Sequence, residues 1–419
     1  MRPNRLLVHY AEIALKGRNR NTFETQLQGN IRHRLRVAGL PWAVRRSRDR
    51  ITVRFSDAPP EEVDRAVELL CRTPGVAAVA PARFFGQRRL RGDGGTPDIE
   101  RLEREMVTLA AERWRPESTF AVRVKRGDKG FPLTSEHLAR RLGRTIIEDT
   151  DWQRVDLSRP DQTFHLDIYP DGLYLYGERK RGVGGLPVYS GGHVLSLISS
   201  GLDSPVAAWM MARRGARTDF LHMTATLVSP AHAGENLVSR IVARLSEYTL
   251  HSRLFLLPYT HFDLALMGKP RSGFEMILFR RFLARAGERI AQRLDARAMV
   301  TGDSFGQVAS QTLENMVTCS RAATMPLLRP LVGLDKQEIV DRARVIGTFD
   351  LSSKPYKDCC ALIGRNPRTR SLPEHIDDLE SRTLPDYEAL LDRTLADGVT
   401  VDFDCGRVVA IDRLDAGAG

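Results

Sequence analysis

The sequence lacks several signals that would place it in a common class of proteins. No apolar run approaches the roughly 18 residues that a membrane-spanning helix needs, and the first twenty residues lack the apolar stretch and cleavage site of a signal peptide. No G-x-x-x-x-G-K-[ST] phosphate loop occurs. The five cysteines (Cys71, Cys319, Cys359, Cys360 and Cys405) contain no C-x-x-C pair, which argues against a disulfide framework, a zinc site and a standard iron–sulfur motif. These absences predict a cytoplasmic protein with reduced thiols, no membrane span and no resident metal centre.

Length and positive charge are what the sequence does have. Its 419 residues, 42% of them hydrophobic, are enough for separate buried cores, and the usual domain size predicts roughly two to four domains. Lys and Arg (63) outnumber Asp and Glu (52), so the formal net charge is +11. A polyanion such as nucleic acid is therefore the first partner to consider. The alternative is that the arginines are dispersed over a solvated surface, so charge alone does not decide.

Hydrophobic periodicity divides the chain into three folded segments. In the first, strand-like alternation at residues 5–10 and 51–55 surrounds a basic helical stretch at 22–37. The second follows a turn at 73–75 and predicts strands and helices at residues 76–80, 99–113, 120–125, 135–147, 163–169 and 173–178. The third follows a glycine-rich linker and predicts an α/β unit with a parallel sheet, from segments 194–198, 205–214, 219–223, 236–248, 253–258, 274–294 and 298–300.

The sharpest motif opens the third segment, in the text VLSLISSGLDSPVAAWMMARRGA (residues 194–216). Residues 194–198 are typical of a buried strand, and residues 199–203 form a small polar loop. Ser204 before Pro205 predicts the N-cap of the next helix, with proline at the first helical position. A strand that leads through Ser and Gly into a helix N-terminus directs free N–H groups and the helix dipole at one point. That arrangement favours a phosphate site.

The loop Ser199-Ser200-Gly201-Leu202-Asp203-Ser204 resembles the S-G-G-x-D-S loop of the PP-loop ATP pyrophosphatases. Ser200 stands where that family usually has glycine, and its Cβ is tolerated without crowding only if the backbone there has a negative φ. Six further blocks, in family order, resemble tRNA 4-thiouridine synthetases of the ThiI type: YAEIALKGRNR (10–20), RGDKGFP (126–132), GGLP (184–187), TGDSFGQVASQTLEN (301–315), RPL (329–331) and DCC (358–360).

The resemblance implies an N-terminal ferredoxin-like domain (1–75), a THUMP RNA-binding domain (76–180), a PP-loop ATP pyrophosphatase domain (181–396) and a C-terminal tail (397–419). It implies an enzyme that uses ATP and Mg²⁺ to adenylate the C4 oxygen of a uridine in tRNA. Sulfur from a cysteine persulfide then replaces that oxygen, which gives 4-thiouridine. The family further implies a cysteine desulfurase as sulfur donor, a homodimer and a role in thiamine thiazole synthesis. The stretch after Cys360 is too short for the rhodanese domain that some members carry.

Matching positions carry the family's nucleotide site onto this chain, and they imply that Asp203 takes part in adenylation. The residues that would contact the nucleotide are Leu197, Ile198, Ser199, Ser200, Gly201, Ser204, His222, Met223, Arg280, Gly302 and Gln311. The aliphatic ones would be core residues in any α/β domain, and His222 fits a structural role equally well. Arg281 lies beside Arg280, so one of the two should face solvent. Lys336 starts a helix with a capping-box pattern, which explains it without a catalytic role.

The family's sulfur-handling cysteine follows a Pro-Tyr turn, here at residues 355–356. Counting forward from Thr301 favours Cys359, and counting back from Pro367 favours Cys360. We choose Cys360 because the second cysteine of the Asp-Cys-Cys form is the usual active position, and we keep Cys359 as the alternative. Adjacent thiols in a polar, basic segment should be partly exposed, although two buried structural thiols are the simpler alternative.

Basic residues of the first two segments are the candidates for contacts with tRNA phosphates. They are Lys16, Arg18, Arg20, Arg123, Lys125, Arg126 and Lys129. Two other functions compete with a tRNA sulfurtransferase: a PP-loop enzyme that adenylates another substrate, and a tRNA-binding protein without catalytic activity. The first has no need of a basic RNA-binding module or of the cysteine pair, and only Ser200 supports the second.

Overall fold

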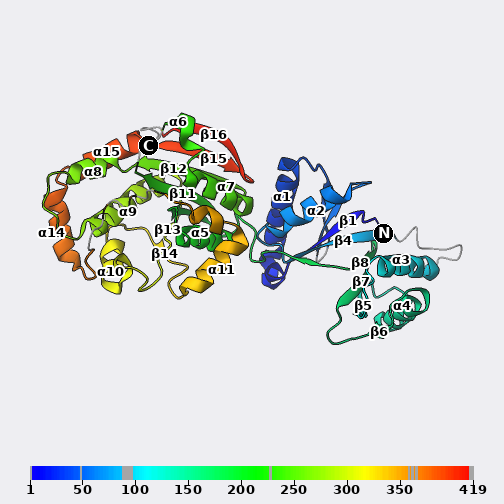
Figure 1. Ribbon diagram of the computed structural model, residues 1–419. Helices are drawn as coiled ribbons and strands as arrows, with labels where there is room; N and C mark the ends of the chain where they lie inside the picture. Colours follow the sequence, from blue (N-terminus) through cyan, green and yellow to red (C-terminus); the bar gives the residue numbers. More distant parts are fainter. Residues whose placement is uncertain are drawn as a thin grey trace. The chain divides into compact units, whose positions relative to one another are not determined.

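The computed structural model describes residues 2–47, 50–86, 98–225, 229–356, 359, 363 and 367–414. The chain forms two compact units, Met1–Gly184 (unit 1) and Gly185–Gly419 (unit 2), which are described separately (Figure 1). Cys360 lies outside the described residues. Within the described part, no helix combines the length and the apolar character needed to cross a membrane.

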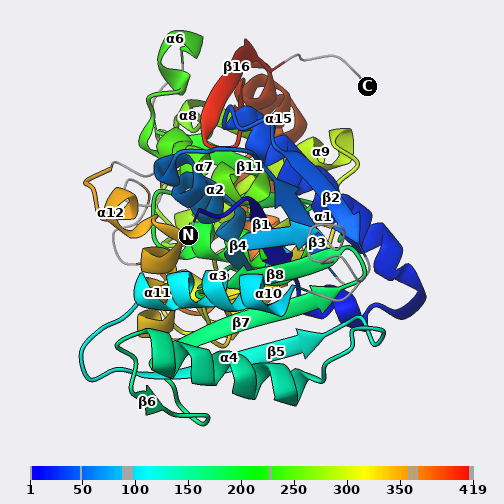
Figure 2. The ribbon, with the colours of Figure 1, turned by 90° about the vertical axis from the view of Figure 1, so that its right-hand side faces the viewer.

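Unit 1 is built on one mixed sheet with the strand order β2-β3-β1-β4-β8-β7-β5-β6 (Figure 2). The short strand β9 pairs with β4. Its strands are β1 (Arg5–His9), β2 (Ala43–Ser47), β3 (Arg50–Arg54), β4 (Ala78–Gly86), β5 (Thr119–Arg126), β6 (Arg154–Val155), β7 (Gln162–Tyr169), β8 (Gly172–Tyr176) and β9 (Lys180–Arg181). Because β4 pairs with β1 on one side and with β8 on the other, the sheet runs without a break from the first sequence segment into the second.

Helices of unit 1 bury the apolar stripes that their sequences carry. They are α1 (Arg20–Val37), α2 (Pro60–Cys71), α3 (Ile99–Ala111) and α4 (Ser135–Asp149), with short 3₁₀ turns η1 (Glu12–Leu15) and η2 (Gly17–Asn19). In α4, the spacing of Leu138, Leu142 and Ile146 puts all three on one buried face. This face joins a core around Trp152, whose indole nitrogen donates to the Ala110 carbonyl at 2.8 Å.

Unit 2 has a sheet with the strand order β14-β13-β10-β11-β12-β15-β16. Its strands are β10 (His193–Leu197), β11 (Arg217–Thr224), β12 (His251–Pro258), β13 (Ala298–Val300), β14 (Leu327–Leu328), β15 (Val399–Asp404) and β16 (Arg407–Arg413). The strands from β14 to β12 are parallel, as the alternating pattern predicts, and the antiparallel β15–β16 hairpin extends the β12 edge. Residues of the predicted C-terminal tail are thus part of this sheet.

Helices cover both faces of the unit 2 sheet, with α5, α7 and α11 on one face and α9 on the other (Figure 1). The helices are α5 (Asp203–Arg213), α6 (Pro230–Ala233), α7 (Leu237–Thr249), α8 (Thr260–Leu266), α9 (Glu275–Arg293), α10 (Leu313–Ser320), α11 (Lys336–Ile346), α12 (Phe349–Ser352), α14 (Pro373–Thr383) and α15 (Tyr387–Ala396), with the 3₁₀ turn η4 (Ala309–Gln311). The carboxyl ends of β10, β11 and β13 meet at one edge, where parallel α/β sheets bind ligands.

Candidate active site

The polar loop after β10 is closed by two serine hydroxyls. The backbone N–H of Ser199 donates to Oγ of Ser204 at 2.8 Å, and the two hydroxyl oxygens are 3.1 Å apart. Ser204 was expected to be the N-cap of the following helix. It is instead the second residue of α5, whose N-cap, Leu202, has no side-chain hydrogen bond to the helix. The hydroxyl of Ser204 stabilises the loop rather than the helix end. The first N–H groups of an α-helix have no acceptor within the helix, so this end of α5 is suited to an anion.

Ser200, the departure from the family loop, causes no backbone strain. It is not among the described residues with positive φ, and neither is Gly201. Positive φ is the condition under which a side chain is penalised. The loop therefore accepts a Cβ at Ser200 without a change of backbone angle.

Gly302 lies in the segment after β13, which packs closely against the start of α5. A Cβ built on Gly302 would lie 2.6 Å from the backbone nitrogen of Ser204, which is closer than real Cβ contacts allow. Only glycine lets the segment after β13 approach the start of α5 this closely. This contact joins two motifs that are about 100 residues apart in the sequence.

The carboxylate of Asp203 is held on both oxygens. Oδ1 accepts a hydrogen bond from Lys336 Nζ at 2.8 Å, and Oδ2 accepts one from Gln307 Nε2 at 3.2 Å. The expected capping box of Asp335 and Glu338 is present at the start of α11. Its effect goes beyond the helix, because it places Lys336 at the first helical position beside Asp203. We did not predict a role for Lys336 or Gln307.

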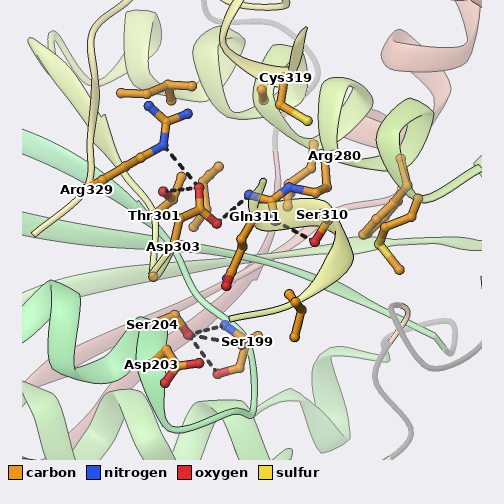
Figure 3. A pocket seen from close by; sticks show the side chains of 18 of the residues that line it. Ser199, Asp203, Ser204, Arg280, Thr301, Asp303, Ser310, Gln311, Cys319 and Arg329 are labelled. Carbon is orange, nitrogen blue, oxygen red and sulfur yellow. Dashed lines mark hydrogen bonds and ion pairs between the residues drawn. The ribbon is translucent and has the colours of Figure 1, made fainter. Parts of the chain in front are cut away.

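A pocket of about 410 Å³ opens beside this loop (Figure 3). Seven of the predicted nucleotide-site and catalytic residues line it: Leu197, Ser199, Asp203, Ser204, Arg280, Gly302 and Gln311. Gln311 is only 8% exposed, and its side-chain oxygen has no hydrogen-bond partner among the described residues. A buried acceptor without a partner is costly unless a ligand supplies a donor.

Charged side chains form a compact network in the pocket (Figure 3). Asp303 binds Arg280 Nη2 at 2.5 Å through Oδ1, and it binds Arg329 Nε at 3.2 Å through Oδ2. Thr301 donates to Oδ2 at 2.8 Å, and Ser310 accepts from Arg280 Nη1 at 3.2 Å. Burial raises the pKa of the Asp303 carboxyl, but Arg280, Thr301 and Arg329 outweigh burial, so the net pKa lies below its ordinary value. Asp303 therefore remains charged and fixes the guanidinium group of Arg280 in the pocket.

Arg281 corrects the expectation that one member of the arginine pair faces solvent. Its side chain is 2% exposed and binds Asp377 at 2.5 Å and Glu380 at 3.0 Å. Arg280, on the neighbouring helical position, lines the pocket. Both arginines are thus used inside unit 2, one to hold α14 and one at the site.

Ile198 and His222 form a chain of polar contacts that ends at Tyr356. Nδ1 of His222 lies 2.9 Å from the carbonyl oxygen of Ile198, so Nδ1 carries a proton. Nε2 lies 3.3 Å from the hydroxyl of Tyr356, which also receives a hydrogen bond from Asn236 at 3.1 Å. His222 and Ile198, together with Ser200, Gly201 and Met223, are not among the pocket-lining residues.

Cys359 is a buried thiol. It is 0% exposed, and its Sγ donates to the carbonyl oxygen of Met223 at 3.1 Å. The expectation that both adjacent thiols are partly exposed is therefore wrong for Cys359. Cys319, on α10, also lines the pocket, and burial raises the pKa of its thiol.

The predicted RNA-binding residues all lie on unit 1, but they differ in how freely they can move. Arg20 is held by Glu24 at 2.7 Å, and Arg126 donates to the carbonyls of Phe131 and Leu133 at 3.3 and 3.2 Å. Arg123 likewise donates to the carbonyl of Leu157 at 2.5 Å, and Lys16 Nζ lies 3.9 Å from a carboxylate oxygen of Glu12. The other predicted contacts, Arg18, Lys125 and Lys129, are exposed side chains. The sequence did not point to a pocket of about 390 Å³ in unit 1 that is lined by Arg113, Arg115, His165 and Arg179, among others.

Three family models match successive parts of this chain. Residues 189–384 match a family model described as thiamine biosynthesis protein (ThiI), residues 5–80 match the ThiI ferredoxin-like domain, and residues 97–178 match the THUMP domain. These matches confirm the predicted order of a ferredoxin-like, a THUMP and a parallel-sheet PP-loop domain.

Curated relatives that match most of this chain are described as probable tRNA sulfurtransferases. A probable tRNA sulfurtransferase of Macrococcus caseolyticus (strain JCSC5402) is 33% identical over 398 residues, which is 94% of this chain and 95% of the relative. Another, from Moorella thermoacetica (strain ATCC 39073 / JCM 9320), is 36% identical over 367 residues, which is 87% of this chain and 89% of the relative. A crystal structure of a 4-thiouridine synthetase–RNA complex with bound ATP matches 97% of this chain and 100% of that chain, with a TM-score of 0.83 and 29% identity.

Proposed function

Because this chain belongs to the ThiI family of tRNA sulfurtransferases, we propose that unit 2 uses ATP to activate a uridine of tRNA, whose C4 oxygen is then replaced by sulfur. The observation that carries this proposal is the closed loop at the start of α5, which opens into the pocket that holds Arg280 and Asp303. A helix N-terminus and a fixed guanidinium group are the groups that bind phosphate.

The charges around the site favour a polyphosphate ligand. Arg280, Arg329 and Lys336 bring three positive charges, against the two carboxylates of Asp203 and Asp303. A positive excess therefore remains beside the N-terminus of α5. The three phosphates of ATP supply the matching negative charge.

The proposed reaction has two steps. The C4 oxygen of the uridine attacks the α-phosphorus of ATP, so an O–P bond forms and pyrophosphate leaves. The terminal sulfur of a cysteine persulfide then attacks C4, and AMP leaves with the former C4 oxygen. An external thiol cleaves the remaining S–S bond, which yields 4-thiouridine and a disulfide. Adenylation is needed because oxide is a poor leaving group and AMP is a good one.

Asp203 is the carboxylate that we place beside the reacting phosphates. Each of its oxygens accepts one hydrogen bond and keeps a further lone pair for a ligand. The residues therefore fit Mg²⁺ that is held mainly by phosphate oxygens, with Asp203 as the protein ligand. When bound, the ion would neutralise charge on the departing pyrophosphate. Lys336 and Gln307 fix the direction of the carboxylate.

We assign the persulfide to Cys360. Cys359 donates its S–H group to Met223 and is fully buried, so a sulfur carried there would have to displace core contacts. We propose a cysteine desulfurase as the donor of the sulfur, and unit 1 as the part that binds tRNA through its exposed basic residues. A homodimer, a cytoplasmic location and a role in thiamine synthesis stay predictions.

The test is 4-thiouridine formation by the purified protein with unmodified tRNA, Mg-ATP and a desulfurase with cysteine, measured by nucleoside mass spectrometry. We expect product with the wild type and with Cys359→Ser, and none with Asp203→Ala or Cys360→Ser. Loss of product in Cys359→Ser with full activity in Cys360→Ser would move the persulfide to Cys359. Absence of product with the wild type, while tRNA still binds, would refute the enzymatic function.

A further inference from the structure

Three apolar side chains are exposed on a pocket-lining residue and on two residues linked to the same loop. Phe305 is 59% exposed, Val308 is 52% exposed and Val332 is 47% exposed, and we call these three residues the rim patch. Val308 also lines the pocket, and the backbone N–H of Phe305 donates to the carbonyl oxygen of Val332 at 3.4 Å. Val308 therefore connects the patch with the site proposed for ATP.

The loop that carries Phe305 is fixed to the catalytic carboxylate. Gln307, two residues further on, donates to Asp203 at 3.2 Å. Ser304, immediately before Phe305, donates through its hydroxyl to the carbonyl oxygen of Leu334 at 3.1 Å. Gly306 has a φ of +71° and donates its N–H to the Gln311 carbonyl at 3.0 Å. These contacts hold the loop on both sides of the aromatic ring.

We propose that the rim patch, with Phe305 as its main contact, receives the base of the target uridine when that base leaves the stacked tRNA. This inference rests on the proposed function, because it requires the C4 oxygen of a uridine to reach ATP in the pocket. A base inside a folded RNA cannot approach such a site while it is stacked, so enzymes that modify bases turn them outward and stack them on apolar or aromatic side chains.

The position and chemistry of the patch favour a nucleobase over a protein partner. An exposed phenylalanine offers a flat face of the kind on which bases stack. The adjoining side chain of Lys336 is 49% exposed and adds positive charge beside Asp203, as an RNA backbone requires. Three side chains around a pocket are also a small area for a stable protein interface.

Substitutions of Phe305 test the role of its ring. For Phe305→Ala we expect kcat/KM for tRNA in 4-thiouridine formation to fall about tenfold or more, because one base–aromatic contact is lost. The dissociation constant for ATP should not change. Phe305→Trp should restore activity, because tryptophan also stacks on a base. Leu264→Ala is the control, since Leu264 is similarly exposed (56%) but lies on α8, away from the pocket lining.

Fluorescence provides a readout that does not depend on turnover. With Phe305→Trp and non-hydrolysable ATP, tRNA should quench the added tryptophan emission beyond the change seen in the wild type. A tRNA with an abasic residue at the target uridine should not produce this extra quenching, and Leu264→Trp should show none with either RNA. Quenching that depends on protein concentration without tRNA would assign the patch to contact between copies, and would overturn the inference.

The two proposals fail in different ways. If the wild type makes no 4-thiouridine under any sulfur source, the proposed function is wrong. If the wild type is active, but Phe305→Ala has the same kcat/KM and intact and abasic tRNA quench Phe305→Trp equally, only the role of the rim patch is wrong.

Discussion

Replacement of Asp303 by asparagine removes the negative charge that binds Arg280 and Arg329 in the pocket. Asp303 has 5% of its side chain exposed, and Arg280 and Arg329 have 20% and 17% exposed. Breaking a buried pair on one side typically costs 3–5 kcal/mol, because the remaining charges lose their partner. The amide keeps the shape and one acceptor, so we expect the free energy of unfolding to fall by about 3 kcal/mol.

Urea unfolding of the wild type and Asp303→Asn measures this loss, and steady-state kinetics should show a higher KM for ATP because Arg280 is no longer fixed. Asp378→Asn is a matched control, since the side chain of Asp378 is 62% exposed and its ion pair with Arg382 should contribute little. Equal stability of Asp303→Asn and Asp378→Asn, or an unchanged KM for ATP in Asp303→Asn, would refute the reasoning.

The pH dependence provides a second check of the same carboxylate. The folded pKa of Asp303 lies below its ordinary value, so its contribution is present at neutral pH and is lost as the pH falls through the folded pKa. The difference in unfolding free energy between the wild type and Asp303→Asn should therefore shrink below about pH 4. A difference that stayed constant down to low pH would mean that the charge of Asp303 does not stabilise the fold.

Three further substitutions have clear expected outcomes. Gly302→Ala should abolish ATP binding in calorimetry while the protein stays folded, because its Cβ would meet the backbone of Ser204 at 2.6 Å; unchanged affinity would contradict the close approach of the two loops. Tyr356→Phe removes the hydroxyl that contacts both Asn236 and His222. Alkylation of Cys359, measured by peptide mapping, should then be faster. An unchanged rate would show that the Tyr356 hydroxyl does not protect this thiol. Ser200→Gly should leave the KM for ATP within about twofold. It should lower the free energy of unfolding by about 0.4 to 1 kcal/mol, because glycine adds backbone freedom where φ is not positive. A large gain in ATP affinity would show that the side chain of Ser200 does crowd the site.

Local sequence signals predicted the elements that carry the site. The apolar run at residues 194–198 is followed by a polar loop and a helix, and the structure has β10 and α5 there. Such strand–loop–helix units are recognised well because the hydrophobic period and the loop residues all lie within about twenty positions. The predicted parallel sheet follows from the repetition of the same unit.

Contacts between distant residues were not predictable in this way. Lys336 has a complete local explanation as the first residue of a capped helix, and nothing nearby in the sequence indicates that it reaches Asp203, 133 positions away. Arg281 was misjudged because its partners, Asp377 and Glu380, are about 100 positions further on. Cys359 was expected to be partly exposed because of its polar neighbours in sequence, whereas its thiol is buried against Met223 of β11. Composition around a residue describes its neighbours in sequence, and burial depends on its neighbours in space.

The most direct test of the central claim follows the oxygen atom that is replaced. A tRNA whose target uridine carries ¹⁸O at C4 is incubated with the protein, Mg-ATP and a sulfur source, and the AMP produced is analysed by mass spectrometry. If the C4 oxygen attacks the α-phosphorus, each 4-thiouridine formed should be matched by one AMP that contains ¹⁸O. Formation of 4-thiouridine with unlabelled AMP would contradict adenylation of the uridine, and with it the role assigned to the pocket at the start of α5.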